Sequence, residues 1–160
     1  HALPQLMERQ LEDEDAERLA QVLSEQGIQL RLNETVKTIE GHEGALNVGI
    51  QNEALGPFTG VVLATGFKPR TALAEEAGLK TNRGICVDPW LQTSDPRIFA
   101  IGDAVECENG QIYAYVLPVR QQASWLARFM AGQEATSWTP PDFKPRAKVH
   151  GFTAALPYKN

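Results

Sequence analysis

Hydrophobic residues near the start of the chain recur at helical spacing. They form one stripe of a helix that we expect over residues 4–26: Leu11, Ala16, Leu19, Ala20, Val22 and Leu23. The acidic residues at positions 12–15 complement the positive end of the helix dipole. Gly27 follows the stripe and suits a carboxyl-terminal cap. Apolar and polar residues then alternate over residues 28–32, which predicts a strand.

Three further strands are predicted before residue 66. Residues 36–40 and 46–51 flank a glycine-containing turn and predict an antiparallel pair. The apolar residues within 58–64 predict a strand that leads into Thr65 and Gly66. A helix combined with several strands indicates the α/β class.

The second half of the chain predicts two helices and two short strands. A helix over residues 71–77 ends at Gly78, and residues 85–87 predict a strand. The apolar run at residues 98–101 predicts a short strand that is buried on both faces. The last helix is expected to begin at Pro118, because proline suits the first helical position. Its predicted apolar face consists of Val119, Ala123, Leu126, Ala127 and Met130.

Composition narrows the function classes. The chain has 160 residues, of which 42% are apolar and 22% charged, as in globular domains. A net charge of −5 argues against binding to nucleic acid or to an anionic membrane surface. No apolar run approaches the ~18 residues of a membrane span, so we expect a cytoplasmic protein. Cys86 and Cys107 form no C-x-x-C motif, so the sequence predicts neither a zinc site nor a redox-active dithiol.

The segment from Thr93 to Asp103 carries the strongest candidate chemistry. Its apolar run is followed by Gly102, which allows a ligand to approach the backbone closely. Asp103 would then stand at the carboxyl end of a strand, where open α/β sheets bind their ligands. A carboxylate there can accept hydrogen bonds from a sugar or polyol hydroxyl. The simpler alternative is a strand followed by an aspartate helix cap.

These eleven residues, TSDPRIFAIGD, resemble the second flavin-binding motif of the FAD- and NAD(P)H-dependent pyridine nucleotide-disulfide oxidoreductases. Residues 61–70, VVLATGFKPR, resemble the segment that joins the NAD-binding domain back to the FAD domain in that family. Residues 73–79 and 83–88 also follow the family pattern, and the resemblance covers residues 1–132 in order and spacing.

The resemblance implies the fold class and the domains. It implies an α/β chain that contains the distal halves of two Rossmann-like three-layer domains, with antiparallel β-strands in the crossover. Residues 1–68 would be the distal part of the NAD(P)H-binding domain, and residues 69–132 the second part of the FAD-binding domain. Residues 133–160 would form a linker and the start of a carboxyl-terminal domain.

The resemblance also implies the cofactor contacts. Asp103, preceded by Gly102, would bond the ribityl chain of FAD. The helix at Pro118 would point at the flavin ring near N1 and O2, where its dipole stabilises the charge of the reduced ring. Leu117 and Val119 would line the same end of the ring. No catalytic residue is predicted, because hydride transfer is chemistry of the cofactor.

Thr65 and Gly66 would turn the backbone near the cofactors. The alternative, a domain-crossing turn without ligand contact, stays open for this pair.

Residues 110–123 are similar to rubredoxin reductases and to the NAD(P)H-binding part of assimilatory nitrite reductases. The element from Tyr115 to Pro118 and the presence of Asp103 favour the rubredoxin reductases. The implied function is hydride transfer from NAD(P)H to FAD, with electrons passed on to an acceptor such as rubredoxin. The alternatives are the NAD(P)H-binding portion of a nitrite reductase and a free-standing, non-catalytic binding module with a degenerate flavin fold.

The chain contains no G-x-G-x-x-G loop, although members of the family need such loops for the FAD and NAD(P)H pyrophosphates. We therefore expect a carboxyl-terminal fragment of a longer enzyme, with no FAD bound to the isolated fragment. Exposed sheet edges are expected to favour its dimerisation.

Overall fold

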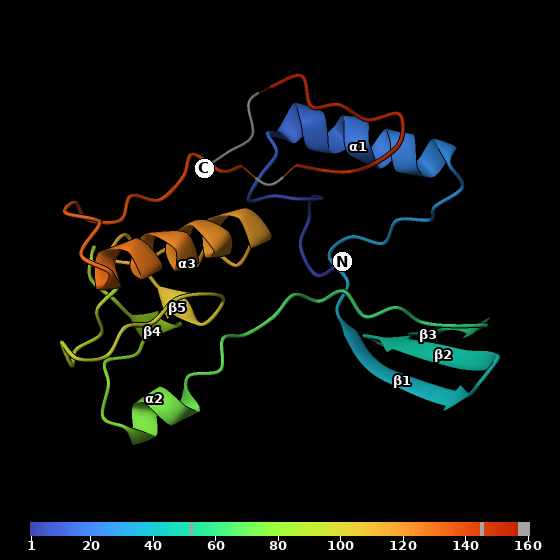
Figure 1. Ribbon diagram of the computed structural model, residues 1–160. Coiled ribbons are helices and arrows are strands. Elements are labelled where there is room, and N and C mark those ends of the chain that lie inside the picture. Colours follow the sequence, from blue (N-terminus) through green and yellow to red (C-terminus); the bar gives the residue numbers. More distant parts are fainter. Residues whose placement is uncertain (52, 145, 157–160) are drawn as a thin grey trace. The chain divides into compact units, whose positions relative to one another are not determined.

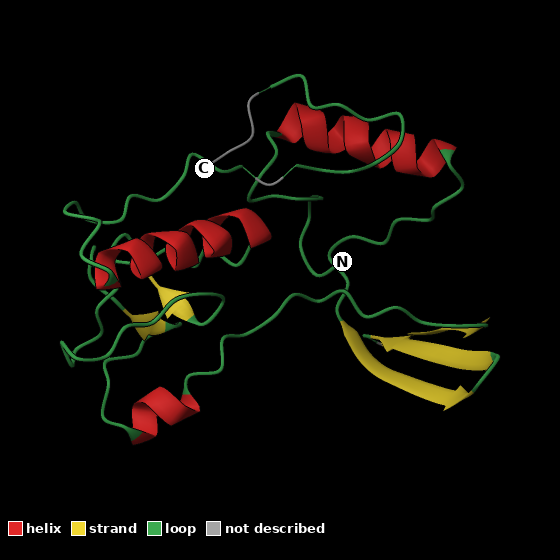
Figure 2. Cartoon of the chain, viewed as in Figure 1, coloured by secondary structure: helices red, strands yellow, loops and turns green. Residues whose placement is uncertain are grey.

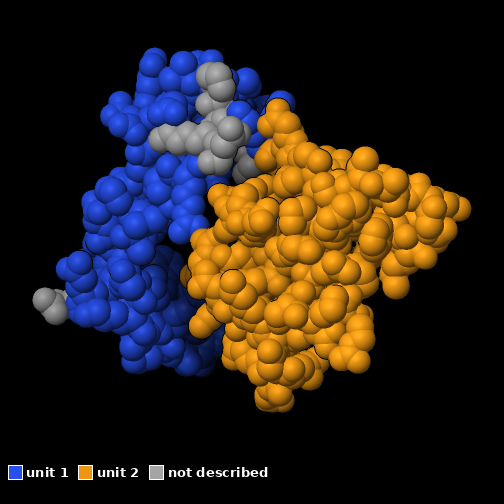
Figure 3. Space-filling view, turned by 90° about the vertical axis from the view of Figure 1, so that its left-hand side faces the viewer, with its two compact units in different colours: residues 1–64, 144–160 blue, residues 65–143 orange. Residues whose placement is uncertain are grey.

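The computed structural model describes residues 1–51, 53–144 and 146–156 (Figures 1 and 2). The chain forms two compact units (Figure 3). The amino-terminal unit comprises His1–Ala64 and Lys144–Asn160, and the central unit comprises Thr65–Phe143. No helix in the described part of the chain is long and apolar enough to cross a membrane.

The first helix of the amino-terminal unit, α1 (Asp13–Glu25), is shorter than the predicted helix over residues 4–26. Met7 has a φ of 50°, and its carbonyl accepts hydrogen bonds from the amides of Gln10 and Leu11. These bonds close a separate turn, so the helix begins only after it. Its end is as predicted: Gly27 has a φ of 82° and forms a Schellman cap.

A three-stranded antiparallel sheet follows, in the order β1 (Val36–His42), β2 (Ala45–Ile50) and β3 (Glu53–Phe58). The predicted pairing of the first two strands is confirmed. The third strand lies earlier than predicted, because Ile50 already pairs with Glu53 and the chain leaves the sheet after Phe58. The strand predicted over residues 28–32 is therefore wrong. Of the strand predicted over residues 58–64, only Phe58 pairs, as the last residue of β3.

The carboxyl-terminal segment of the chain packs on α1, as the blue helix and the red segment of Figure 1 show. Leu11, Leu19 and Phe152 are buried together. The buried Asp15 carboxylate accepts hydrogen bonds from the amides of Ala155 and Leu156, at 2.9 and 2.8 Å. These two bonds hold the pKa of Asp15 below its usual range. Of the predicted range 133–160, positions 145 and 157–160 lie outside the described residues.

The central unit contains α2 (Ala72–Glu76), β4 (Ile85–Cys86), β5 (Val105–Glu106) and α3 (Val116–Met130). The two strands pair in parallel. The helix predicted over 71–77 and the strand predicted over 85–87 are confirmed.

The strand predicted over residues 98–101 is wrong. Phe99 forms only an isolated bridge with Gln92, and the side chains of Ile98 and Ile101 are 41% and 36% exposed. Residues 98–100 bond instead to a preceding loop, through the amide of Thr93 and the carbonyl of Leu91. The strand that pairs with β4 is β5, which comes after Asp103 rather than before it.

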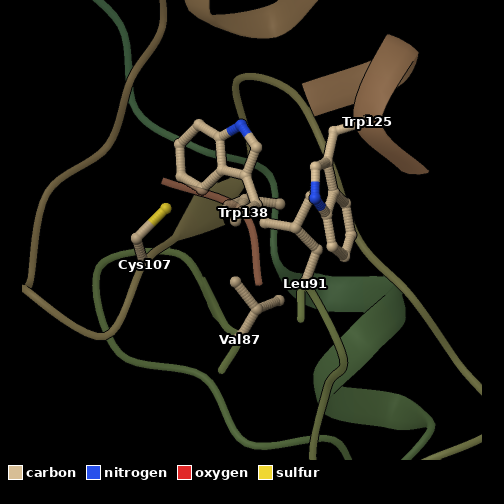
Figure 4. Packing of buried hydrophobic residues seen from close by; sticks show 6 residues of the cluster. Val87, Leu91, Cys107, Trp125 and Trp138 are labelled. Atoms are coloured by element: carbon tan, nitrogen blue, oxygen red, sulfur yellow. The ribbon is translucent and has the colours of Figure 1, made fainter. Parts of the chain in front are cut away.

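The core of the central unit lies beneath α3 (Figure 4). It contains Val87, Leu91, Val105, Cys107, Trp125 and Trp138. The indole of Trp125 stacks on Phe129, with ring centroids 5.1 Å apart. Its Nε1 donates to the carbonyl of Thr136 at 3.1 Å, which holds the chain that follows α3 against the helix.

The buried face of α3 differs from the predicted one. Pro118, Gln122 and Trp125 are buried, whereas Ala123 and Met130 of the predicted face are exposed. Pro118 and Gln122 lie seven and three residues before Trp125, so the three side chains share one face of the helix. Pro118 is the third residue of α3 rather than the first. Its missing N–H costs no bond there, because the first four amides of a helix have no partner within it.

Candidate functional site

Gly102 and Asp103 form a tight turn immediately before β5. The amide of Val105 donates to the carbonyl of Gly102 at 3.1 Å, and Gly102 has a φ of 94°, a conformation that favours glycine. Asp103 is exposed on this turn, and its carboxylate accepts no hydrogen bond from the described residues. The turn therefore presents a carboxylate with all of its acceptor capacity available.

Gln122 holds this turn from the side of α3. Its Oε1 accepts a hydrogen bond from the amide of Gly102 at 2.8 Å, and the side chain is 1% exposed. The sequence analysis does not predict this residue, because a polar glutamine is not part of the apolar pattern that marks the buried face of a helix. The available signal was its spacing, four residues after Pro118 and three before Trp125.

Glu106 holds the turn from the opposite side. Its buried carboxylate accepts hydrogen bonds from the amide side chain of Asn82 at 2.9 Å and from the backbone amides of Arg83 and Gly84 at 2.8 and 3.0 Å. Burial raises the pKa of this carboxyl. The hydrogen bonds lower it by more than burial raises it, so the pKa lies below its usual range. The carboxylate thus fixes the segment 82–84 against β5.

The segment 82–84 and the chain at residues 104–106 lie in close contact. A Cβ atom at Gly84 would lie 2.8 Å from the carbonyl oxygen of Ala104 and 2.9 Å from the amide nitrogen of Glu106. The amide of Ile85 donates to that same carbonyl at 2.7 Å. The residues on both sides of Asp103 are therefore fixed by backbone contacts, although Asp103 itself is exposed.

The amino-terminal end of α3 is the second part of the candidate site. Tyr115 precedes the helix and makes no capping hydrogen bond with its side chain. The amides of Val116 and Leu117 have no acceptor within the helix, and both side chains are exposed, by 77% and 51%. Unpaired amides beside apolar side chains favour a ligand that is apolar in part and carries negative charge near the helix.

The predicted site residues fall into two groups. Gly102 is joined to α3, which contains Leu117, Pro118 and Val119, by the hydrogen bond that its amide donates to Oε1 of Gln122. Thr65 and Gly66 lie in the exposed segment of residues 59–70, hereafter the connecting segment. No hydrogen bond among the described residues joins the connecting segment to either part of the site.

Residues 1–127 match the family model for pyridine nucleotide-disulphide oxidoreductases. The chain belongs to this family. The predicted family membership and α/β class are confirmed, and the antiparallel sheet of the amino-terminal unit agrees with the antiparallel strands that were part of the predicted fold class.

Curated relatives of this pyridine nucleotide-disulphide oxidoreductase chain share a name. The "Nitric oxide reductase FlRd-NAD(+) reductase" of Vibrio vulnificus is 41% identical over 123 residues, which are 77% of this chain and 32% of that protein. The protein of the same name from Salmonella paratyphi B is 38% identical over 122 residues, with 76% and 32% covered. The chain therefore spans about a third of the length of these relatives.

Solved structures of other reductases have a similar fold. A ferredoxin reductase for the CYP199A2 system from Rhodopseudomonas palustris superposes with a TM-score of 0.77 and 29% identity, covering 87% of this chain and 36% of that one. A NAD-dependent persulfide reductase from A. fulgidus gives a TM-score of 0.75 and 29% identity, covering 87% and 26%. The family fold is thus preserved across members whose names give different substrates.

Proposed function

We propose that this chain contributes the ribityl-binding carboxylate and the ring-facing helix of an FAD-dependent oxidoreductase that takes hydride from NAD(P)H. The observation that carries the proposal is the free carboxylate of Asp103, on a turn that is fixed from two sides. A ligand-binding carboxylate needs both properties, because a rigid backbone lowers the entropy cost of binding.

The residues present fit FAD. The carboxylate of Asp103 is exposed and matches the hydroxyl groups of a polyol chain. A Cβ atom built at Gly102 would meet no atom within 4 Å, so the backbone of the turn is open to a ligand. The exposed Val116 and Leu117 suit an apolar ring, and the unpaired amides of α3 suit negative charge at its edge.

FAD, when bound, supplies the hydride-accepting and electron-passing chemistry. The residues of this chain would bind and orient the cofactor. Asp103 accepts hydrogen bonds from hydroxyl groups, and the dipole of α3 favours negative charge next to Leu117. Leu117 and Val119 exclude water with their apolar side chains. We keep Thr65 and Gly66 as predicted cofactor contacts that await a test.

Names of the relatives support a donor and an acceptor class. The curated relatives are named for NAD(+) and for the acceptor abbreviated FlRd, and one solved relative is named a ferredoxin reductase. We therefore propose NADH as the hydride donor and a rubredoxin-like electron carrier as the partner protein. NADPH and nitrite are the competing donor and acceptor.

The test is a visible absorption spectrum of the protein produced from its complete reading frame, before and after anaerobic addition of NADH. We expect a flavin band that bleaches with NADH faster than with NADPH, and that returns on addition of oxidised rubredoxin but not of nitrite. A colourless protein would contradict the oxidoreductase and support a non-catalytic binding module. Recovery of the band with nitrite would support the nitrite reductase alternative.

A further inference from the structure

We propose that Gln122 is a positioning residue for Asp103: it sets the place of the ribityl-binding carboxylate relative to the ring-facing end of α3. This inference rests on the proposed function and adds to it a residue that contacts no cofactor atom itself. Its basis is the single hydrogen bond from the amide of Gly102 to Oε1 of Gln122.

The side chain of Gln122 is itself held in place. It is 1% exposed and lies on the same face of α3 as the buried Pro118 and Trp125. Trp125 is fixed in turn by stacking on Phe129 and by its bond to the carbonyl of Thr136. The acceptor oxygen of Gln122 is therefore a rigid point of the central unit, because rotation of its side chain is blocked by the core around it.

The bond acts on the residue that directly precedes Asp103. The Gly102 carbonyl closes the turn by accepting from Val105, so the Gly102 amide is the remaining backbone group of that residue. Without an acceptor at Gln122, the amino-terminal side of the turn loses this restraint, while Glu106 continues to hold the other side. The carboxylate of Asp103 would then sample positions away from the end of α3.

The side chain of Gln122 thus connects the turn that bears Asp103 with helix α3, and both would contact the same cofactor. The Asp103 carboxylate faces hydroxyl groups of the cofactor, and the amino-terminal end of α3 faces its charged ring. A small error in their separation weakens binding and also changes the potential felt by the ring. A purely structural glutamine would affect the stability of the fold but not these two quantities.

The test compares Gln122→Met with Gln121→Met in the protein from its complete reading frame. Methionine keeps the length and the helix preference of glutamine but removes the strong acceptor. Gln121 is the adjacent, exposed glutamine of the same helix, so it controls for the substitution itself. We expect Gln122→Met to raise the FAD dissociation constant about tenfold and to shift the flavin reduction potential. Gln121→Met should leave both unchanged.

A double-mutant cycle with Asp103→Asn assigns the effect to the turn. If Gln122 acts by positioning Asp103, the two substitutions are non-additive, and Asp103→Asn costs little FAD affinity once Gln122 is methionine. Additive effects, or an unchanged dissociation constant accompanied only by a lower melting temperature, would overturn the inference.

Gln122→Asn provides a second variant if the methionine protein does not fold. It keeps the amide but is one methylene too short to reach Gly102, and we expect the same loss of affinity. A wild-type protein without FAD would overturn the proposed function together with this inference. FAD binding that is equal in the wild type and in both Gln122 variants would overturn the inference alone.

Discussion

The turn at Gly102 and Asp103 and the connecting segment each contain part of a family motif, yet they differ in how they are held. The turn is fixed by Gln122 on one side and by the segment 82–84 on the other. The connecting segment, residues 59–70, is almost entirely exposed, and among the described residues it takes part in no hydrogen bond. It contains the boundary between the two units at Ala64 and Thr65.

The difference shows that a motif identifies a segment without saying what orders it. At Asp103 the ordering groups belong to this chain and lie 18 or more residues away in sequence. At Gly66 no such groups are found among the described residues. We therefore expect substitutions in the turn to change the stability of the central unit, and equivalent substitutions in the connecting segment to leave it unchanged.

Replacement of Glu106 by glutamine gives the largest expected effect. The glutamine amide can still accept from Asn82 through its oxygen, but its nitrogen then faces the amides of Arg83 and Gly84. Two donors are left without an acceptor in a buried place, so we expect a loss of about 2–4 kcal/mol in the free energy of unfolding. Urea denaturation followed by tryptophan fluorescence measures it, because all three tryptophans lie in the central unit.

Glu108→Gln is the matched control for this substitution. Glu108 lies two residues further along and is exposed, so its replacement should change the free energy of unfolding by less than about 0.5 kcal/mol. Equal effects of the two substitutions would show that the buried carboxylate does not hold the turn.

The contribution of Glu106 should also depend on pH. Its pKa is lower in the folded protein than in the unfolded chain, so its contribution is fully present above the unfolded value of about 4.3. It is lost as the pH falls through the folded pKa. The stability difference between the wild type and Glu106→Gln should therefore be constant above about pH 5 and shrink below about pH 4.

Local patterns predicted the parts of the fold that depend on local interactions. The hairpin of β1 and β2, the end of α1 at Gly27 and the short helix α2 were all foreseen from periodicity and glycine positions. The missed elements depend on pairing between distant segments. Residues 98–101 have the composition of a strand, but β4 pairs with the more polar residues Val105 and Glu106 instead.

The same limit applies to the candidate site. Gly102 and Asp103 were found because the motif contains them. Gln122 and Glu106 were not found, because a buried polar side chain is explained only by the backbone amides that it meets in space. Nothing in the local sequence says that Gln122 will face Gly102, 20 residues earlier. The spacing of Gln122 relative to Trp125 becomes informative only once the buried face of α3 is known.

Gly102 lies in the turn and Gly66 in the connecting segment, so the same substitution can be made in both. Gly102 and Gly66 have similar φ values of 94° and 87°, and at neither would a Cβ atom meet another atom within 4 Å. The intrinsic strain of alanine is therefore alike at both. Gly102 must keep its conformation, since both its amide and its carbonyl are bonded, whereas Gly66 can relax to a negative φ.

We expect Gly102→Ala to lower the free energy of unfolding of the central unit by about 1–2 kcal/mol. Gly66→Ala should change it by less than about 0.5 kcal/mol, or stabilise slightly, because alanine restricts the unfolded chain. Urea denaturation of the two variants by tryptophan fluorescence gives both values. A loss at Gly66 as large as that at Gly102 would mean that the connecting segment is as firmly held as the turn.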